Sequence, residues 1–536
     1  MWTPLNVKRV WIFTFELEDL ARVGGLGSAV RRHVEILERE GFDITIFMPS
    51  HGRHLSNDIR ERYRLRFEEN FRCCGSRRGI DGRDYGYCLG AYTGRIGSAK
   101  LVLFIGLDPW TGSIIDRWEI YDNSPEKVSL SIRALRCWLN YSRERPDIII
   151  GNDWHGGLIA SAARIYLEEE NLSIPYIYFI HLLSSQAFPY HYISSEWSGL
   201  PDRPIPLWRF WRHEKIHIRD LWDSHRGSVE LFNIDVADAI GSVSYGYMNE
   251  ILSRTDYRYS PKACVIYNTT DWNSRDVERY LDTLYGGHDR CALRWRFYRD
   301  MISRAGPCIG HIEPDGFLIV SGGRLTWQKG FDILLKSLEY LDPRFKILIL
   351  GVRVGDTNYE NYLKSIADRF FGRALITCNN IEKIVYETFN YLANVVVVPS
   401  RYEPFGLTSV EAQAVGTPVV ISRIPGLSET IRDLRLNPSG TGLASEPEDP
   451  RDLAIAIKTL AIITQSLDCG SRDAINEIPE VSVRDLVRAN PSIIEKIREN
   501  CIDNVNKNFR IEVVENMFRE CIEKARLYAY YRSFSY

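Results

Sequence analysis

The chain has 536 residues, of which 45% are hydrophobic, so it is too long for one ordinary domain and apolar enough for two cores of roughly 250 residues each. Its formal net charge of −3 excludes a general attraction to nucleic acids or to anionic membranes. The apolar stretch 10–15 is too short to span a bilayer, and no small-residue cleavage site follows a charged start. We therefore expect a cytoplasmic protein.

Eleven cysteines are scattered along the chain, with only Cys73 and Cys74 adjacent and no CxxC pair. This pattern indicates neither a zinc site nor a secreted disulfide framework, so buried free thiols are the expectation. Many arginines and few glutamines are, however, typical of a thermophile. Intracellular disulfides do occur in thermophiles, and that alternative stays open.

Buried strands alternate with helices from residue 1 to about residue 265, which predicts a first Rossmann-like α/β domain. The strands expected there are 9–15, 44–48, 101–105, 147–150, 176–180 and 239–242. A second domain of the same kind is expected over 266–508. Its predicted strands are 317–320, 346–350, 375–378, 395–398 and 418–421.

Two helical segments complete the chain. Residues 467–500 are predicted to form a polar helical insertion whose role the sequence does not show. A last helix, at about 511–530, falls in the segment 509–536 that follows the second domain.

The segment Ser400-Arg-Tyr-Glu-Pro-Phe-Gly-Leu-Thr-Ser-Val-Glu411 places two carboxylates across a turn that opens a helix. The preceding run 395–398 predicts a parallel strand buried on both faces, which Pro399 ends. Glu403 would then lie in a strand-to-helix loop, where ligands of open α/β sheets bind. Glu411 would lie about one turn inside the helix. The alternative is that Glu411 merely complements the helix dipole.

A second strand-to-helix loop, Ser321-Gly-Gly-Arg-Leu-Thr-Trp-Gln-Lys-Gly330, carries two cations. Backbone N–H groups at such a loop favour anions. The fork of Arg324 and the point charge of Lys329 suit a diphosphate. A solvated loop with two surface cations is the alternative.

These motifs resemble those of retaining glycosyltransferases with the GT-B fold, and within them the bacterial and archaeal glycogen and starch synthases. Further collinear segments carry the resemblance, namely 22–27 (Arg-Val-Gly-Gly-Leu-Gly), 49–53 (Pro-Ser-His-Gly-Arg), 152–155 (Asn-Asp-Trp-His), 179–182 (Phe-Ile-His-Leu), 243–247 (Val-Ser-Tyr-Gly-Tyr) and 266–272 (Ile-Tyr-Asn-Thr-Thr-Asp-Trp). The resemblance implies an α/β fold with two Rossmann-like, doubly wound domains that face an interdomain cleft. It also implies that the last helix returns to the N-terminal domain.

The resemblance further implies transfer of glucose, with retention, from ADP- or UDP-glucose to the nonreducing end of an α-1,4-glucan. Arg324 and Lys329 would stabilise the leaving diphosphate, His181 would lie over the sugar, and Glu403 would orient it. No metal or other cofactor is implied. The substrate contacts would come from Arg22, Gly24, Gly25, Asp153, Asn268, Phe405, Gly406, Leu407, Thr408 and Glu411.

Several of these residues also have a purely structural interpretation. His181 could be a core histidine, Asp153 a helix N-cap and Asn268 a turn residue. His51 and His54 have no third ligand nearby, so we do not expect them to bind metal. Aromatic residues crowd the segment 184–226, which predicts either a glucan surface or a hydrophobic subdomain; they are Tyr190, Tyr192, Trp197, Trp208, Phe210, Trp211 and Trp222.

The chain departs from the family pattern at four places. Arg22 stands where a lysine is usual, which puts donor or acceptor preference in doubt. Asn152 replaces the first histidine of His-Asp-Trp-His, residues 268–271 lack the usual glycine, and Pro425 replaces the first glycine of Gly-Gly-Leu. Glu403, Arg324, Lys329 and His181 are all retained, so we expect an active enzyme.

Three other functions are alternatives. A related GT-B enzyme could use a small acceptor, as a trehalose or disaccharide-phosphate synthase does. A catalytically silent glucan-binding protein could share the fold. A dinucleotide-dependent oxidoreductase is the weakest, because no G-x-G-x-x-G follows the first strand. The choice between ADP- and UDP-glucose and the oligomeric state stay open.

Overall fold

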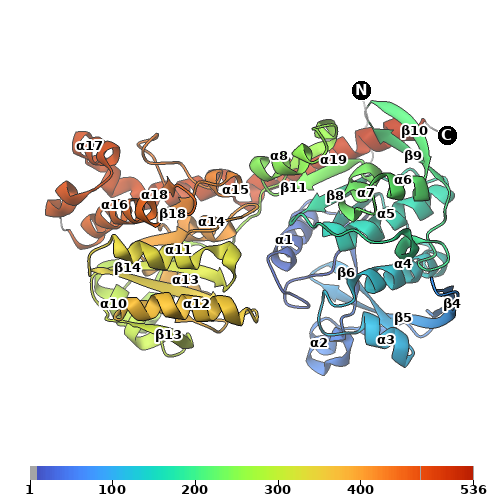
Figure 1. Cartoon of the computed structure of the whole chain (residues 1–536), viewed down its shortest axis with the longest axis horizontal. Coiled ribbons are helices and arrows are strands. Elements are labelled where there is room, and N and C mark those ends of the chain that lie inside the picture. Colours follow the sequence, from blue (N-terminus) through green and yellow to red (C-terminus); the bar gives the residue numbers. More distant parts are fainter. Residues whose placement is uncertain (1–8, 210, 471, 535–536) are drawn as a thin grey trace. The chain divides into compact units, whose positions relative to one another are not determined.

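A computed structural model describes residues 9–209, 211–470 and 472–534. The described chain divides into two compact units (Figure 1). Unit 1 comprises 1–243, 248–267 and 515–536, and unit 2 comprises 244–247 and 268–514. None of the described helices is both long and apolar enough to cross a membrane.

Unit 1 is built on a ten-stranded sheet of described residues with the order β12-β11-β8-β7-β1-β2-β6-β5-β3, in which β4 also pairs with β5. The stretch from β12 to β6 is parallel, whereas β3, β4 and β5 add antiparallel. A separate hairpin joins β9 to β10. The strands are β1 (Arg9–Phe13), β2 (Asp43–Pro49), β3 (Arg66–Phe67), β4 (Cys73–Arg78), β5 (Asp84–Ile96), β6 (Ala99–Gly106), β7 (Ile148–Asn152), β8 (Tyr176–Ile180), β9 (Pro204–Arg209), β10 (Arg212–His217), β11 (Ala239–Ser242) and β12 (Ala263–Val265).

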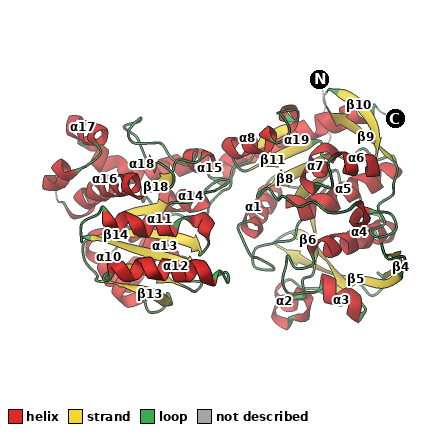
Figure 2. Ribbon diagram, in the orientation of Figure 1, coloured by secondary structure: helices red, strands yellow, loops and turns green. Residues whose placement is uncertain are grey.

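Several helices of unit 1 pack against this sheet (Figure 2). The buried helix α5 lies against β1, β7 and β8, and α4 lies beside α5. The helices are α1 (Leu26–Arg39), α2 (Asn57–Arg62), α3 (Pro109–Ile115), α4 (Ser124–Tyr141), α5 (Asp153–Glu169), α6 (Ile218–Ser224), α7 (Val229–Val236), α8 (Tyr245–Ser253), which starts in unit 2, and α19 (Ile511–Ser533), which belongs to unit 1 from Glu515 onward.

All six strands expected in the first half are present, but the antiparallel strands were not predicted. The reason is visible in β5, whose residues are mostly exposed or half-buried. A strand at the sheet margin lacks the continuous apolar run that marks a buried parallel strand.

Unit 2 contains a seven-stranded sheet of described residues with the order β13-β16-β15-β14-β17-β18-β19. Every neighbouring pair is parallel except β13 with β16. The strands are β13 (Pro307–Ile312), β14 (Phe317–Arg324), β15 (Phe345–Val352), β16 (Arg373–Thr377), β17 (Val395–Val398), β18 (Val419–Ser422) and β19 (Gly442–Ser445). The helices are α9 (Ser274–Tyr285), α10 (Arg290–Met301), α11 (Phe331–Lys336), α12 (Thr357–Ala367), α13 (Lys383–Leu392), α14 (Leu407–Ala414), α15 (Pro425–Ser428), α16 (Pro450–Cys469), α17 (Val481–Ala489) and α18 (Ser492–Asn508).

The sequence predicted a polar helical insertion at 467–500, but this segment also contributes apolar residues to the core. Val483 and Val487 of α17 and Ile493 and Ile497 of α18 are buried in the same core as the sheet and α16. Both helices are amphipathic. An apolar stripe packs against the core, and the more numerous charged residues lie on the other faces. This segment therefore completes the core of unit 2.

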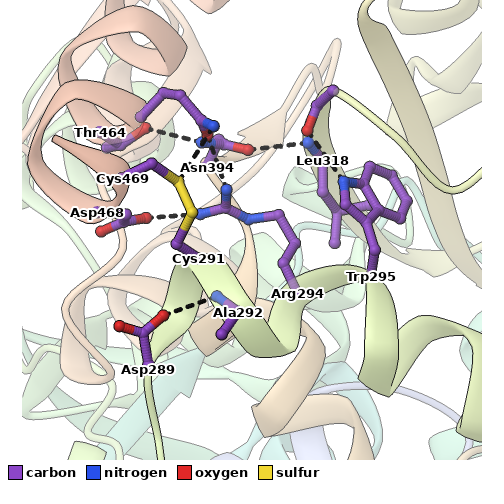
Figure 3. Close-up of a disulfide and its surroundings, with 12 residues drawn as sticks. Asp289, Cys291, Ala292, Arg294, Trp295, Leu318, Asn394, Thr464, Asp468 and Cys469 are labelled. Carbon is purple, nitrogen blue, oxygen red and sulfur yellow. Dashed lines mark hydrogen bonds and ion pairs between the residues drawn. A yellow bond between two sulfur atoms is a disulfide. The ribbon is translucent and has the colours of Figure 1, made fainter. Parts of the chain in front are cut away.

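The cysteines also correct the expectation of free thiols, because ten of the eleven are paired in the structure. The disulfides join Cys73–Cys137, Cys74–Cys88, Cys264–Cys521, Cys291–Cys469 and Cys308–Cys378. Cys501 is buried and free. The partners lie 14 to 257 residues apart in the chain, and sequence alone does not define such pairings. Figure 3 shows the pair Cys291–Cys469, which links α10 to the end of α16.

We predict the thiol content that follows from this pairing. The chain unfolded in guanidinium without reductant should react with a thiol reagent at one site, Cys501, and after reduction at all eleven cysteines. A thiol titration of the unfolded protein, before and after reduction, measures both numbers. Eleven reactive thiols before reduction would show that the pairs do not form.

Candidate functional site

One group of predicted residues lies at the carboxyl ends of β14 and β17 in unit 2. Glu403 lies in the loop between β17 and α14, as predicted, and Gly406 is the N-cap of α14 with φ +110°. A side chain at Gly406 would be strained and would meet Leu427 Cδ2 at 2.3 Å. A Cβ at Gly426 would lie 2.3 Å from the Glu403 carbonyl oxygen. The short helix α15 therefore packs directly under the Glu403 loop.

Glu403 is held by a cation from the neighbouring loop. Lys329 Nζ lies 2.5 Å from Glu403 Oε2, and the Ser400 hydroxyl donates to the same oxygen at 3.3 Å. Both charged side chains are largely but not fully buried. The two motifs singled out in the sequence thus meet through an ion pair across 74 residues of chain.

Arg324 is the last residue of β14 and lies half-buried in the same loop. Its guanidinium has no hydrogen-bond or ion-pair partner among the described residues. The two glycines before it allow tight packing, since a Cβ at Gly322 would meet the Tyr386 hydroxyl at 2.1 Å. An unpaired guanidinium in the same loop as Lys329 leaves this loop with donors suited to an anion.

The remaining predicted residues of unit 2 divide into two groups. Glu411 lies in the second turn of α14; burial raises the pKa of Tyr386, and the charge of Glu411 adds to that effect. The Asn268 side-chain oxygen is buried and has no hydrogen-bond partner among the described residues. Phe405 is 2% exposed and packs edge-on against Phe509, so its ring serves the core, whereas Leu407 and Thr408 are half-buried at the helix start.

Arg401 joins the two loops, a role that the sequence did not indicate. Its guanidinium binds Asp332 in a bidentate manner at 2.8 and 2.9 Å, donates to the Trp327 carbonyl, and stacks 3.5 Å over the Trp327 ring. It also pairs with Glu448. Burial favours the neutral acid, yet Arg401 holds the pKa of Asp332 below its usual value. The loop that carries Lys329 is thereby fixed against the loop that carries Glu403.

We expect Arg401→Lys to lower kcat about tenfold or more, because an ammonium keeps the charge but loses the bidentate fork and the ring stacking. Steady-state kinetics and thermal unfolding of the same preparation measure the effect. The matched control is Arg369→Lys, an exposed arginine whose ion pair is with Glu339, which should leave kcat unchanged. Equal kcat values for both variants would contradict the positioning role.

A second group of predicted residues lies in unit 1, at the carboxyl ends of β1, β7 and β8. His181 follows β8 and is 8% exposed. Asp153 is not the N-cap of α5, since that position belongs to Asn152 and has no side-chain cap bond. Asp153 Oδ1 instead accepts the backbone N–H groups of His181 and Leu182 at 2.8 and 3.1 Å. Burial raises the pKa of Asp153 to about 8.

Glu16 binds the backbone of the glycine loop that precedes α1. Glu16 Oε2 accepts the N–H groups of Val23 and Gly24, each at 2.9 Å. The N–H group of Gly24, one of the predicted substrate contacts, is therefore occupied by Glu16 in this conformation. Arg22 is exposed, forms an ion pair with Glu18 at 3.2 Å and donates to the Gly24 carbonyl.

His33 of α1 lies next to His181 and is buried. Its ring lies 4.6 Å from Phe179, 5.6 Å from His181 and 5.1 Å from Phe518, measured between ring centroids. Neither ring nitrogen has a hydrogen-bond partner among the described residues, and burial lowers the pKa of His33 to about 3. The imidazole is therefore neutral in the folded protein at any ordinary pH.

We predict a pH-dependent stability contribution from His33. Below pH 6.5 His33 is protonated in the unfolded chain but stays neutral in the folded chain. The free energy of unfolding therefore decreases as pH falls from 6.5 toward 3. At pH 5 the loss is about 2 kcal/mol. The free energy of unfolding can be measured with urea at pH 8 and at pH 5. Its decrease between the two pH values should be about 2 kcal/mol smaller in His33→Leu than in wild type. The exposed-site control His311→Leu should match wild type; an unchanged difference in His33→Leu would refute the prediction.

His51 and His54 lie in the segment that follows β2. His51 Nδ1 lies 3.2 Å from Lys127 Nζ, and the ammonium also binds three backbone carbonyls of the 117–120 loop. Among the described residues no group of three or more His, Cys, Asp or Glu side chains could hold a metal ion. His51 thus contacts the lysine that holds the 117–120 loop in place.

The aromatic segment 184–226 is mostly core. Trp197 and Trp222 are 5% and 1% exposed, and their indole N–H groups donate to Glu126 and to the Phe188 carbonyl. Trp211, at the turn between β9 and β10, is 66% exposed, and Phe210 lies outside the described residues. The packing favours a hydrophobic subdomain for most of the segment.

Comparison with known proteins gives the family. Residues 9–259 match the model of the starch synthase catalytic domain, and residues 309–466 match that of glycosyl transferases group 1. The chain belongs to the starch and glycogen synthase family. It is a hexosyltransferase, as the sequence predicted.

Individual relatives agree with this assignment. The glycogen synthase of Thioalkalivibrio sulfidiphilus is 24% identical over 502 residues, which cover 87% of this chain and 94% of that protein. The glycogen synthase of Thermus thermophilus is 24% identical over 78% of this chain and 86% of its own length. Among solved structures, the catalytic domain of starch synthase IV from Arabidopsis thaliana, bound to ADP and acarbose, aligns with a TM-score of 0.67 at 17% identity, covering 97% of this chain and 99% of that one. This last likeness confirms the predicted GT-B fold.

Proposed function

We propose that this family member transfers glucose from ADP- or UDP-glucose to the nonreducing end of an α-1,4-glucan, with retention of configuration. The observation that carries the proposal is the loop pair of unit 2, in which Lys329 contacts Glu403 at 2.5 Å and the Arg324 guanidinium has no partner among the described residues. A nucleoside diphosphate and a sugar need this combination of fixed cations and a hydroxyl-binding carboxylate.

The chemical step requires charge stabilisation in two places. The bond between the anomeric carbon and the diphosphate oxygen breaks, and its electron pair leaves with the phosphate. The acceptor hydroxyl oxygen bonds to the anomeric carbon on the same face, and its proton passes to the leaving phosphate. Arg324 and Lys329 stabilise the negative charge that develops on the leaving group.

The other predicted residues bind and orient in this scheme. Glu403 accepts hydrogen bonds from sugar hydroxyls, and Glu411 from the ribose hydroxyls of the nucleotide. Asn268 offers a buried, unpartnered oxygen to a sugar hydroxyl. From unit 1, His181 contacts the transferred sugar, while Arg22 and Gly25 contribute to substrate binding. Asp153 acts through the backbone of residues 181 and 182, to which it is bonded.

The test is release of nucleoside diphosphate from ADP-glucose and from UDP-glucose, each with and without maltooligosaccharide, alongside Glu403→Ala. Release that depends on the oligosaccharide and disappears in the variant supports the proposal and identifies the donor. Release only with a monosaccharide or sugar phosphate acceptor would instead indicate a small-acceptor transferase. Glucan binding without release from any donor would indicate a silent binding protein.

A further inference from the structure

Asn152 and His181 form a buried pair at the ends of the neighbouring strands β7 and β8. His181 Nε2 lies 3.0 Å from Asn152 Oδ1, and Asn152 Nδ2 donates to the Phe13 carbonyl at 3.3 Å. Asn152 is 1% exposed. Its side chain therefore spans the ends of three adjacent strands, β1, β7 and β8.

The orientation of the Asn152 amide follows from its second bond. The Phe13 carbonyl can only accept, so the NH₂ group of Asn152 must face it, and the amide oxygen must face His181. An amide oxygen can only accept a hydrogen bond. His181 Nε2 must therefore carry the proton in this pair.

His181 is a neutral imidazole, because burial holds its pKa well below the usual value. A neutral imidazole carries one N–H and one lone pair. With the proton on Nε2, Nδ1 is the lone-pair atom. Nδ1 is buried and has no hydrogen-bond partner among the described residues, so it is an acceptor whose lone pair the fold itself does not satisfy.

We propose that Asn152 is a positioning residue, whose amide fixes His181 as the Nε2–H tautomer so that Nδ1 can accept a hydrogen bond from a hydroxyl of the transferred sugar. The inference rests on the proposed function for the identity of that hydroxyl. The tautomer itself does not depend on it.

The choice of asparagine has a physical reason. A histidine, which the family resemblance leads one to expect at position 152, would place a second titratable ring against His181 and could act as donor or acceptor. An amide does not titrate, and its bond to Phe13 fixes which end accepts. The backbone of His181 is held separately by Asp153 Oδ1, so Asn152 controls the ring while Asp153 controls the main chain.

The tautomer can be measured without any substrate. In the full-length protein labelled with ¹⁵N-histidine, His181 should show a protonated Nε2 and an unprotonated Nδ1, assigned by loss of the signals in His181→Gln. Asn152→Ala should change this pattern toward the other tautomer or a mixture. A protonated Nδ1 in wild type, or an unchanged pattern in Asn152→Ala, would overturn the proposal even if the enzyme is fully active.

A double-mutant cycle tests the catalytic consequence. We expect Asn152→Ala to lower kcat about ten- to a hundredfold when His181 is present, the usual range for a residue that orients a functional group. In the His181→Ala background the same change should lower kcat less than about twofold, because its target is gone. Equal losses in both backgrounds would mean that Asn152 is merely structural. If wild type releases no nucleoside diphosphate at all, the proposed function fails, while the tautomer measurement still decides the role of Asn152.

Discussion

Lys329→Met is expected to lower kcat about a thousandfold, the range found when one charge-stabilising donor is removed from a preorganised site. Lys329 contributes its charge in the loop after β14, and its ion-pair partner is Glu403 at 2.5 Å. The substitution keeps much of the alkyl stem but removes the cation that, in the proposed mechanism, stabilises the leaving phosphate. It also leaves the Glu403 carboxylate without its counter-charge, so the sugar would be held less firmly.

The measurement is kcat and KM for nucleoside diphosphate release, with thermal unfolding recorded on the same samples. Because charge develops mainly in the transition state, the loss should appear in kcat more than in KM. Lys364→Met on the exposed face of α12 is the matched control and should behave as wild type. If Lys329→Met lowers kcat by less than about tenfold, Lys329 does not stabilise the transition state as proposed.

The sequence was sufficient to place the Glu403 loop because several local signals agree there. Four consecutive valines predict a strand buried on both faces, Pro399 ends it, and Gly406 takes a left-handed φ at the start of α14. Each of these signals involves residues only a few positions apart. Local signals of this kind also predicted the β14 loop with Arg324 and Lys329.

What the sequence could not supply were pairings between distant residues. Arg401 and Asp332 lie 69 positions apart, and nothing in either neighbourhood indicates that they meet. The same holds for Cys264 and Cys521, which are 257 positions apart. A cysteine in a single sequence looks the same whether paired or free. The contact between Glu16 and the Gly24 N–H was missed for a related reason, since a carboxylate eight residues before a glycine loop has no distinctive spacing.

The most destabilising single change we expect in unit 2 is Asp468→Asn. Asp468 is almost fully buried at the end of α16, where Arg294 contacts it at 2.5 Å and Arg498 at 2.7 and 2.9 Å. Figure 3 shows Arg294 and Asp468 beside the Cys291–Cys469 disulfide. Arg294 also binds Gln465, which accepts from Asn394, and Asn394 accepts the Leu318 N–H of β14. One carboxylate therefore pairs with two arginines and links α10, α16 and α18 near the sheet.

The isosteric amide removes that charge while both guanidiniums stay buried, and breaking such a pair typically costs about 3–5 kcal/mol. Urea unfolding at pH 7 measures the loss in unit 2, and Asp485→Asn, whose partner Arg488 is exposed, should cost less than about 1 kcal/mol.

Acid provides an independent test of the same charge. Burial disfavours the carboxylate, but Arg498 and Arg294 hold the pKa of Asp468 below its usual value. Its stabilisation is therefore present above about pH 4, where the unfolded chain ionises, and is lost as pH falls through the lower folded pKa. The gap in unfolding free energy between wild type and Asp468→Asn should narrow below about pH 4. A gap that is independent of pH would mean that charge does not cause the loss, and would attribute it to the hydrogen bonds that the amide NH₂ group, a donor, cannot accept from the two guanidiniums.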